Sequence, residues 1–543
     1  MKLDGVKLAL AQGLFAAAAE EMGVTLMRTA RSPNIKERLD HSCAIFDRLG
    51  KLVAQAAHIP VHLGSMPQAV VAVLERTALE DGDIVMLNDP YAGGTHLPDI
   101  TLVSPVFLDP RRRAPDFLVA SRAHHADVGG AAPGSMPLAH EVYEEGFRIP
   151  PVHLRRRGRL CADTLALLLA NVRTAEERRA DLMAQIGAQL TGERRLKELG
   201  RAQGRSALES AVEGLIAYGE RCVAAAIATL PRGRFAFADV LDDDGLGNGP
   251  LTIRVALTIR RSSVDLDFTG TDPMAPGPVN AVEAVTRAAA AYAVRCVLGG
   301  DFPVNHGSLS RIRVRVPAGT LVSARLPAAV AAGNVETSQR IVDTVLGAFA
   351  RALPGVIPAA SSGTMNNLLI GGHDPGRGRP FAYYETLGGG HGAAAGGDGE
   401  HAMQAHMTNT RNTPIESLEH AYPLRVTETR IRRGSGGAGR RRGGDGIERT
   451  VELLAPARVT VISDRRARGP WGAAGGRDGQ PGENGVALPG KGERSMPGKF
   501  VADLPAGAQV RVASPGGGGY GPPPRGRVSR RSARRSGARR RGA

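Results

Sequence analysis

The chain has 543 residues, of which 42% are hydrophobic and 22% charged, enough for a large buried core and for two or three structural units. Its four cysteines lie far apart and form no C-x-x-C motif, which excludes a disulfide-rich scaffold. More than half of the net charge of +16 comes from nine arginines between Arg525 and Arg541. This tail lacks the interleaved aromatic residues of a nucleic-acid platform, so we expect no nucleic-acid binding.

The N-terminal stretch is typical of an ordinary helix over residues 1–30. Asp4 stands where a signal peptide would be basic, and Gln12 interrupts the apolar stretch, so we expect a cytoplasmic protein. No apolar run reaches the roughly 18 residues that a transmembrane helix needs, and no membrane association is expected.

A hairpin and a strand meander are predicted next. Residues 41–54 carry two apolar runs around the turn-forming stretch Asp47–Gly50. Ser65 is expected to open a helix that reaches about Ala78. The apolar runs at 83–87, 100–108 and 117–123 are too short for helices and predict three neighbouring strands.

The rest of the chain alternates between helical and strand patterns. Residues 163–230 predict a helical hairpin, and residues 251–271 a strand pair. Asn280 and Thr337 are expected to cap two later helices. After about Gly434 the chain is rich in glycine, with one strand pair predicted near 448–463.

Because strands and helices are intermixed without a regular βαβα order, the expected fold is mixed α/β (α+β) with largely antiparallel sheets, in one multi-lobed subunit. Five regions are predicted. They are a metal-site lobe (1–160), a helical hairpin (161–232), a central α/β region (233–433), a glycine-rich β region (434–521) and a disordered, dispensable Arg-rich tail (522–543).

The densest group of polar residues lies in NDPYAGGTHLPD (88–99) and SRAHHADVGG (121–130). In a meander, the start of the second strand and the end of the third meet at one edge of the sheet. His96, Asp99 and His124 would therefore lie together, and two imidazoles with one carboxylate suit Zn, Mn or Fe. Asp40 and Asp127 are further carboxylates that could join. The alternative is a hydrogen-bonded loop without metal, and at most one of His124 and His125 should face the site.

Three other patterns carry weaker signals. His58 and His62 lie four residues apart, but Pro60 between them works against a shared helical face. Glu141 and Glu145 could lie on one helical face, either as a solvated acidic face or with a general base beside the metal. No Walker A sequence occurs, so the chain shows no nucleotide site of its own.

Seven ordered blocks carry a resemblance to a known family. They include SPNIKERLDHSCAIFD, LNDPYAGGTHLPDITLVSPVF, AHHADVGGAAPGSMP, AAGNVETSQRIVDTVLG and ISDRRARGPWGAAGG. From about residue 5 to Gly521 the chain resembles the hydantoinase B/oxoprolinase family, to which acetone and acetophenone carboxylase subunits are also similar. After GGGGYG the chain departs from the family pattern and continues into the Arg-rich tail.

The resemblance implies the B-type subunit of a two-component, ATP-dependent enzyme that hydrolyses a cyclic amide of the hydantoin or 5-oxoproline class. A partner A-type subunit with an actin-like ATPase fold would bind ATP and phosphorylate the substrate, so a hetero-oligomer is expected. The B-type subunit would complete the reaction at one divalent metal (Zn, Mn or Fe).

The same resemblance implies the metal ligands, and the chemistry of the implied reaction suggests the other site residues. His96, Asp99 and His124 would be the metal ligands, with Asp40 as a possible fourth. Asp127 or Glu141 would take the proton as the catalytic base. Lys36 and Arg38 would bind a substrate carboxylate or phosphate. Two alternatives remain open: a subunit of an ATP-dependent ketone carboxylase of the acetone or acetophenone type, or a scaffold subunit without chemistry of its own.

Overall fold

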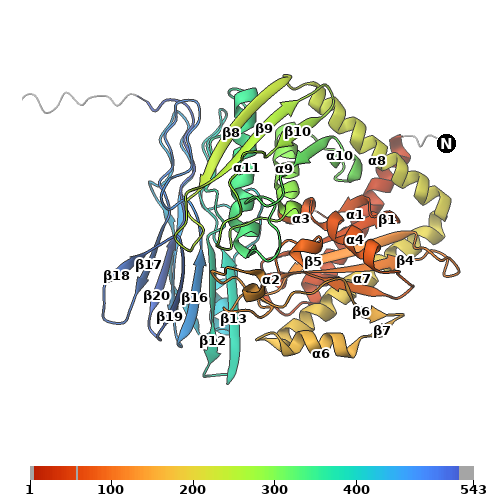
Figure 1. The fold of residues 1–543 in the computed structure, drawn as a ribbon, viewed down its shortest axis with the longest axis horizontal. Helices are drawn as coiled ribbons and strands as arrows, with labels where there is room; N and C mark the ends of the chain where they lie inside the picture. Colours follow the sequence, from red (N-terminus) through yellow and green to blue (C-terminus); the bar gives the residue numbers. More distant parts are fainter. Residues whose placement is uncertain (1–4, 57–58, 525–543) are drawn as a thin grey trace, which may run out of the picture.

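The computed structural model describes residues 5–56 and 59–524 (Figure 1). It confirms the predicted mixed α/β fold, with four sheets in which nearly all neighbouring strands are antiparallel. The predicted disordered tail lies outside the described residues from position 525 onward. Within the described part, no helix is long and apolar enough to cross a membrane.

The N-terminal lobe is built on a seven-stranded antiparallel sheet with the order β2-β1-β5-β4-β3-β6-β7. The predicted hairpin and the predicted meander are both confirmed as neighbouring strands of this sheet. The strands are β1 (His41–Asp47), β2 (Leu52–Gln55), β3 (Ile84–Leu87), β4 (Asp99–Val106), β5 (Phe117–His124), β6 (Val152–Arg156) and β7 (Arg159–Leu160).

Helices cover both faces of this sheet. On one face lie α1 (Gly5–Thr29), α7 (Ala175–Gln203) and α8 (Arg205–Ala228), and Phe15 of α1 packs in one core cluster with Val119. On the other face lies α4 (Met66–Arg76), whose Val70 shares a cluster with Leu118 and Ala120. Neighbouring residues of β5 thus face opposite layers, as the pleat of a strand requires. The helical pattern predicted for residues 163–230 is confirmed, but α7 packs mainly on α1 and the sheet, and the pairing of the two long helices as a hairpin stays a prediction.

Short helices connect the elements around the lobe, and several bring polar side chains to one end of the sheet. They are α2 (Pro33–Lys36), α3 (Pro60–Leu63), the 3-10 helix η1 (Pro90–Ala92), α5 (Val142–Glu145) and α6 (Ala162–Ala170). Ser65 precedes α4 as predicted, but its hydroxyl donates to Val61 O and accepts from Arg122, so no capping box forms.

The second sheet has the order β11-β10-β9-β8, and only its β10–β11 pair is parallel. Its strands are β8 (Gly233–Leu241), β9 (Leu251–Ile259), β10 (Val264–Asp267) and β11 (Ile312–Arg315). The long helices α9 (Glu283–Leu298) and α11 (Ser338–Ala352) pack against each other and α11 against β8 and β9, while α10 (His306–Leu309) lies on α8.

Two predicted helix caps in this region are wrong. Helix α9 begins at Glu283, and the Asn280 amide instead donates to the carbonyl oxygens of Ala275, Gly277 and Ala329. Thr337 lies inside a continuous helical stretch, because a π-helical turn, η2 (Gly333–Thr337), leads directly into α11. In both cases the polar side chain serves a long-range contact that local spacing does not reveal.

The C-terminal half forms two packed sheets. One has the order β13-β12-β16-β19 and the other β14-β15-β20-β17-β18, and their apolar faces share one core. The strands are β12 (Asn367–Asp374), β13 (Arg379–Thr386), β14 (Leu424–Arg432), β15 (Gly446–Leu453), β16 (Ala457–Ile462), β17 (Glu483–Ala487), β18 (Glu493–Met496), β19 (Lys499–Leu504) and β20 (Gln509–Ala513), with α12 (Ile415–Ala421) before β14.

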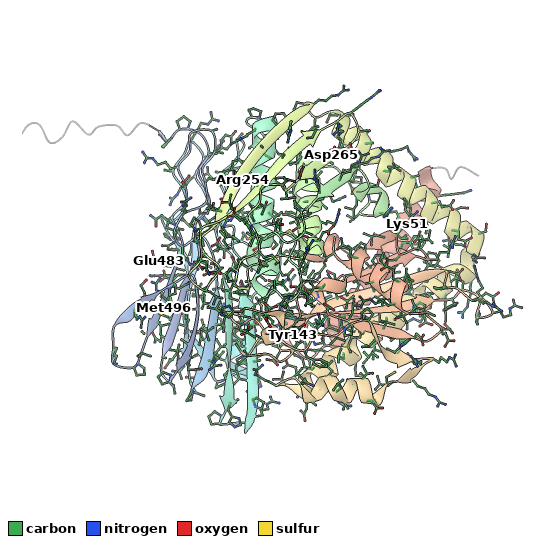
Figure 2. The ribbon with its side chains drawn as sticks, in the orientation of Figure 1. Lys51, Tyr143, Arg254, Asp265, Glu483 and Met496 are labelled. Atoms are coloured by element: carbon green, nitrogen blue, oxygen red, sulfur yellow. The ribbon has the colours of Figure 1, made fainter. Side chains whose placement is uncertain are left out.

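The strand pair predicted near 448–463 is wrong. Strands β15 and β16 are consecutive, but they belong to different sheets and do not pair. The chain crosses between the two layers at Ala455–Pro456, so that Leu453 and Val459 meet across the shared core. In Figure 2, Glu483 and Met496 mark this C-terminal sandwich, Arg254 and Asp265 the second sheet, and Lys51 and Tyr143 the N-terminal lobe.

A bundle of glycine-rich segments joins the sandwich to the rest of the molecule. Its centre is the segment 515–521, whose successive N–H groups donate to carbonyl oxygens at Ala360 and in the segments 441–444 and 473–480. Gly517 donates to Gly444 O, Gly518 to Ala360 O, and Gly519 to Arg477 O, at 2.8–2.9 Å. A Cβ on Gly517 would lie 1.9 Å from His391 O, so only glycine permits this approach.

Candidate metal centre

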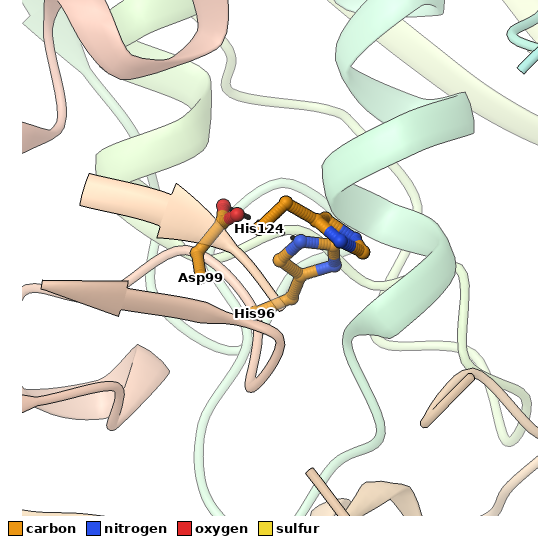
Figure 3. A group of neighbouring side chains, drawn as sticks. All are labelled: His96, Asp99 and His124. Carbon is orange, nitrogen blue, oxygen red and sulfur yellow. Dashed lines mark ion pairs between the residues drawn. The ribbon is translucent and has the colours of Figure 1, made fainter. Parts of the chain in front are cut away.

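The polar group predicted from the meander forms at the end of strands β4 and β5. Asp99 and His124 stand directly opposite each other in the antiparallel register of these strands. His96 comes from the loop before β4, which is held in place because the Asn88 amide donates to Leu97 O at 2.7 Å. All three side chains are at most 3% exposed. Figure 3 shows them converging from the loop and the two strand ends.

The three side chains are close enough to share one ion. One candidate ligand atom from each lies within 4.8 Å of the others, and this is the only such group of three among the described residues. His96 Nε2 is 3.3 Å from Asp99 Oδ2, and the rings of His96 and His124 have centroids 5.0 Å apart.

The imidazole nitrogens of this group fit a metal. Both ring nitrogens of His96 and Nε2 of His124 are buried and have no hydrogen-bond partner in the structure. Leaving such groups unpaired costs about 1–3 kcal/mol each, so native proteins rarely bury them without a ligand. Two imidazoles and a carboxylate suit Zn, Mn or Fe, and three protein ligands leave a coordination position open. The metal itself stays a prediction.

Neighbouring side chains hold the group in place. The amide nitrogen of Asn34 lies 3.4 Å from His124 Nδ1, and the amide oxygen accepts from Arg38 at 3.5 Å, so Asn34 links the His124 ring to Arg38. Tyr384 stacks on the His124 ring at 4.6 Å between centroids. The Thr95 hydroxyl donates to Asp99 Oδ2 at 2.5 Å. The ligands are therefore fixed by residues from α2, β13 and the loop before β4.

Charges at the site favour an ionised Asp99 and a neutral His124. Burial acts to raise the pKa of Asp99, but His96 and His62 outweigh it and hold that pKa well below its usual range. Burial, reinforced by His96, lowers the pKa of His124 well below its usual value. A carboxylate and a neutral imidazole are the protonation states in which these groups bind metals.

A cavity of about 20 Å³ lies beside the group. Asp40, His62, Asp99, His124 and Asn334 line one part of it, and the wall is completed by Ile59, Val61, Val335, Met365, Tyr384, Thr386, Met407 and Thr408. This volume holds about one water molecule. Asp40 is also buried, and burial raises the pKa of its carboxyl despite the opposing charge of Arg38.

The other predicted site residues lie in different surroundings. Arg38 is fully buried, donates to Tyr384 O at 2.7 Å and to the Thr386 hydroxyl at 3.2 Å, and so ties α2 to β13, whereas Lys36 is exposed. Asp127 is buried away from the cavity, and its carboxylate accepts hydrogen bonds from Gly129, Gly134 and Arg173. The catalytic role predicted for Asp127 stays a prediction.

Glu141 and Glu145 do not share a face as the spacing suggested. Glu141 is exposed and caps α5, while Glu145 is fully buried and accepts hydrogen bonds from the N–H groups of Val330 and Ala331, both at 2.8 Å. Glu141 does not line the cavity, and its catalytic role also stays a prediction. His125 points away from the group, as expected, and its Nε2 lies 2.9 Å from Gln185 Oε1.

Two polar cavity residues had little or no signal in the sequence, His62 and Asn334. His62 lies in α3, which begins at Pro60, and its Nε2 is 3.6 Å from Asp99 Oδ2, while its Nδ1 lies 2.8 Å from the Ser42 hydroxyl. Pro60 starts this helix and does not break it, so the objection to His62 was misplaced; His58 lies outside the described residues. Asn334 comes from the η2 turn, and only its place among apolar residues hinted at a special role.

Comparison with known proteins identifies relatives over nearly the whole chain. A family model described as hydantoinase B/oxoprolinase matches residues 4–523. An uncharacterized protein of Methanocaldococcus jannaschii is 40% identical over 93% of this chain and 88% of its own length. The 5-oxoprolinase 1 of Arabidopsis thaliana is 38% identical over 95% of this chain, which spans only 42% of that protein. A Pseudomonas protein named as the B-type subunit of a D-/L-hydantoinase is 30% identical over 96% of this chain and 90% of its own.

Two solved structures are similar in fold. The ATP-dependent caprolactamase from Pseudomonas jessenii superposes with a TM-score of 0.89 at 28% identity, covering 96% of this chain and 92% of that one. The nucleotide-free acetone carboxylase superposes with a TM-score of 0.87 at 18% identity, covering 95% and 76%, a likeness that concerns the fold alone.

Proposed function

The chain belongs to the hydantoinase B/oxoprolinase family, and from this premise we propose that it is the B-type subunit of an ATP-dependent cyclic-amide hydrolase. The proposed substrates are rings of the hydantoin or 5-oxoproline class. The names of its relatives support this, because 5-oxoproline, hydantoins and caprolactam all contain an amide bond within a ring.

The observation that carries the proposal is the buried group of His96, Asp99 and His124 beside a cavity that holds about one water molecule. A ring amide is a poor electrophile because resonance stabilises its carbonyl, so hydrolysis needs both an activated carbon and an activated water. When bound to this group, a divalent ion such as Zn, Mn or Fe supplies Lewis acidity, which lowers the pKa of coordinated water toward 7.

Activation of the carbon is assigned to a partner. We propose an A-type subunit with an actin-like ATPase fold, which phosphorylates the amide oxygen at the expense of ATP. Relative lengths support two components, because this chain spans 90% of a hydantoinase B-type subunit but 42% of a plant 5-oxoprolinase. The larger protein has room for both components in one chain.

The proposed ring opening starts from the imidate phosphate that the partner forms, in which a C=N bond replaces the amide carbonyl. The oxygen of a water molecule adds to that carbon, and one proton passes to the ring nitrogen. The C–N bond then breaks as the added hydroxyl becomes a carbonyl and gives its proton to the departing amine. A second water converts the resulting acyl phosphate to carboxylate and inorganic phosphate.

We assign the proton transfers to Asp40. Besides the predicted ligand Asp99, three carboxyl groups were considered from the sequence, Asp40, Asp127 and Glu141, and of these Asp40 is the one that lines the cavity. Its carboxyl also lies outside the group of three that can share an ion, which favours a proton carrier over a fourth ligand. Arg38 is assigned a positioning role, since its guanidinium is held by Tyr384 and Thr386.

The test combines the chain with an A-type partner, ATP and one of four substrates: 5-oxoproline, hydantoin, caprolactam, or acetone with bicarbonate. Ring opening that needs ATP, both subunits and metal supports the proposal. Product from acetone and bicarbonate alone would instead establish the ketone carboxylase. If the A-type partner opens the ring fully without this chain, then this chain is a scaffold subunit without chemistry of its own.

A further inference from the structure

The π-helical turn η2 (Gly333–Thr337) presents a rigid backbone to the cavity. The Thr337 hydroxyl donates to Val279 O, and the Ser338 hydroxyl donates to Asn334 O at 2.6 Å. Glu336 Oε1 accepts from the Met365 N–H at 3.1 Å and the Asn367 amide at 2.8 Å. Turns of this type are rare and are found mostly at functional sites, because they redirect one side chain out of the helical register.

Asn334 is the side chain that this turn directs at the cavity. It is 4% exposed, and its Nδ2 lies 3.5 Å from Asp99 Oδ2, at the outer limit of a hydrogen bond. Its Oδ1 is buried and has no partner among the described residues. An amide oxygen in this position is stabilised by any donor that enters the cavity.

The size of the cavity indicates which hydrogen-bond donor can reach Asn334. About 20 Å³ is room for one water molecule and too little for a ring substrate. The polar groups around it are mainly acceptors, the carboxylates of Asp40 and Asp99 and the oxygen of Asn334. The Thr386 hydroxyl is already engaged by Arg38 and Thr410. A water molecule has two protons to donate to such a surrounding.

Resting on the proposed function, we propose that Asn334 is a catalytic residue that binds the attacking water. Its Oδ1 accepts one hydrogen bond from that water, which turns an oxygen lone pair toward the activated ring carbon. The amide does not ionise, so it orients the water without taking its proton. Water adds through its oxygen, and its proton leaves by the route described above.

The substitution Asn334→Leu removes the acceptor, together with the amide nitrogen that contacts Asp99, and keeps the branched shape of the side chain. Gln339→Leu is the matched control, because Gln339 lies on the next turn, is 1% exposed and also has a buried, unpartnered side-chain oxygen, but does not line the cavity. The complex of chain, A-type partner and metal is assayed for kcat, KM and the ratio of ATP consumed to ring opened.

We expect Asn334→Leu to lower kcat about 100-fold, in the range of a lost transition-state contact, with KM unchanged. Phosphorylation continues on the partner, so the ratio of ATP to product rises. Metal content stays at the wild-type level and the melting temperature changes little, because removal of an unsatisfied acceptor offsets the loss of the long contact with Asp99. Gln339→Leu keeps wild-type kcat. In Asn334→Ser, a hydroxyl acceptor restores part of the rate.

Three results would overturn the inference. Loss of metal from Asn334→Leu would make Asn334 a ligand, and a fall in melting temperature with kcat intact would make it structural. Equal losses of kcat in Asn334→Leu and Gln339→Leu would point to general damage to α11. Failure of the proposed function itself shows differently, as absence of ATP-dependent ring opening in the wild-type complex.

Discussion

The N-terminal lobe and the glycine-rich bundle exclude water in opposite ways. In the lobe, side chains of β5 such as Phe117 and Val119 fill the space between the sheet and helix α1, where the ring of Phe15 packs at a tilt against that of Phe117, with centroids 5.8 Å apart. In the bundle, segments touch through their backbones, and the N–H groups of the segment 515–521 each bond to a different neighbour. The first region is held by buried apolar area and the second by hydrogen bonds at contact distance.

This difference explains where chemistry can be placed. Layers separated by side chains can leave a cavity and unpaired imidazoles at a sheet edge without losing the core. A bundle of touching backbones cannot leave such a cavity, because any added atom would overlap the backbone of a neighbouring segment. It also explains how a protein with 4% aromatic residues and 70 glycines remains tightly packed.

The largest expected effect is therefore in the bundle. In Gly517→Ala the new Cβ would lie 1.9 Å from His391 O, and the backbone cannot move because both of its neighbours are hydrogen-bonded. We expect a loss of at least about 4 kcal/mol, or no soluble protein. The measurement is chemical denaturation, with Gly396→Ala as control, since nothing lies within 4 Å of a Cβ there. A wild-type midpoint for Gly517→Ala would refute backbone packing as the basis of this region.

In the lobe, removing a predicted metal ligand should leave the fold. His96→Ala and His124→Ala delete rings that make few hydrogen bonds to the rest of the protein, so we expect metal content to fall to background while stability drops by only about 1–2 kcal/mol. His125→Ala should keep the metal but lose its contact with Gln185. Elemental analysis and circular dichroism measure the two effects. Wild-type protein that binds no added Zn, Mn or Fe would contradict the assignment.

A buried carboxyl should make the lobe sensitive to pH. Burial raises the pKa of Glu145 to about 8, above the value of about 4.3 in an unfolded chain. The neutral carboxyl stabilises the fold fully below pH ~4, and this contribution is lost as the pH rises through 8. Relative to the wild type, Glu145→Gln should therefore gain stability as the pH rises from 5 to 9.

Melting temperatures across that range measure the Glu145 effect. Glu141→Gln serves as the control for the loss of a carboxyl from the same short helix region, because Glu141 is exposed. A constant difference between Glu145→Gln and the wild type would show that Glu145 is ionised in the folded protein.

The smallest expected effect is on the orientation of a ligand. Asn34→Ala removes the partner of His124 Nδ1 but no predicted ligand. We expect metal affinity to fall about 10- to 100-fold, as for other groups that orient a ligating histidine. Competition with a chromogenic chelator measures it. Unchanged affinity would mean that stacking on Tyr384 suffices to hold the ring.

The sequence alone determined those parts of the structure that form between segments consecutive in the chain. The hairpin, the meander and the edge where His96, Asp99 and His124 meet follow from short apolar runs that are consecutive in the chain, because antiparallel strands joined by short loops pair with each other. The mixed α/β class and the family follow from pattern and ordered motifs over nearly the whole length.

Only the tertiary structure decided which distant groups complete the site. Tyr384 and Asn334 reach the cavity from more than 200 residues away, and no local period marks them. Asn280 and Thr337 look like helix caps because local spacing cannot show the distant carbonyls that they bond. The alternation of apolar and polar residues in β15 and β16 indicates that each is a strand, but not which strands it pairs with. Pairing and cavity lining are properties of segments brought together by the shared core, and they arise only when the whole chain has folded.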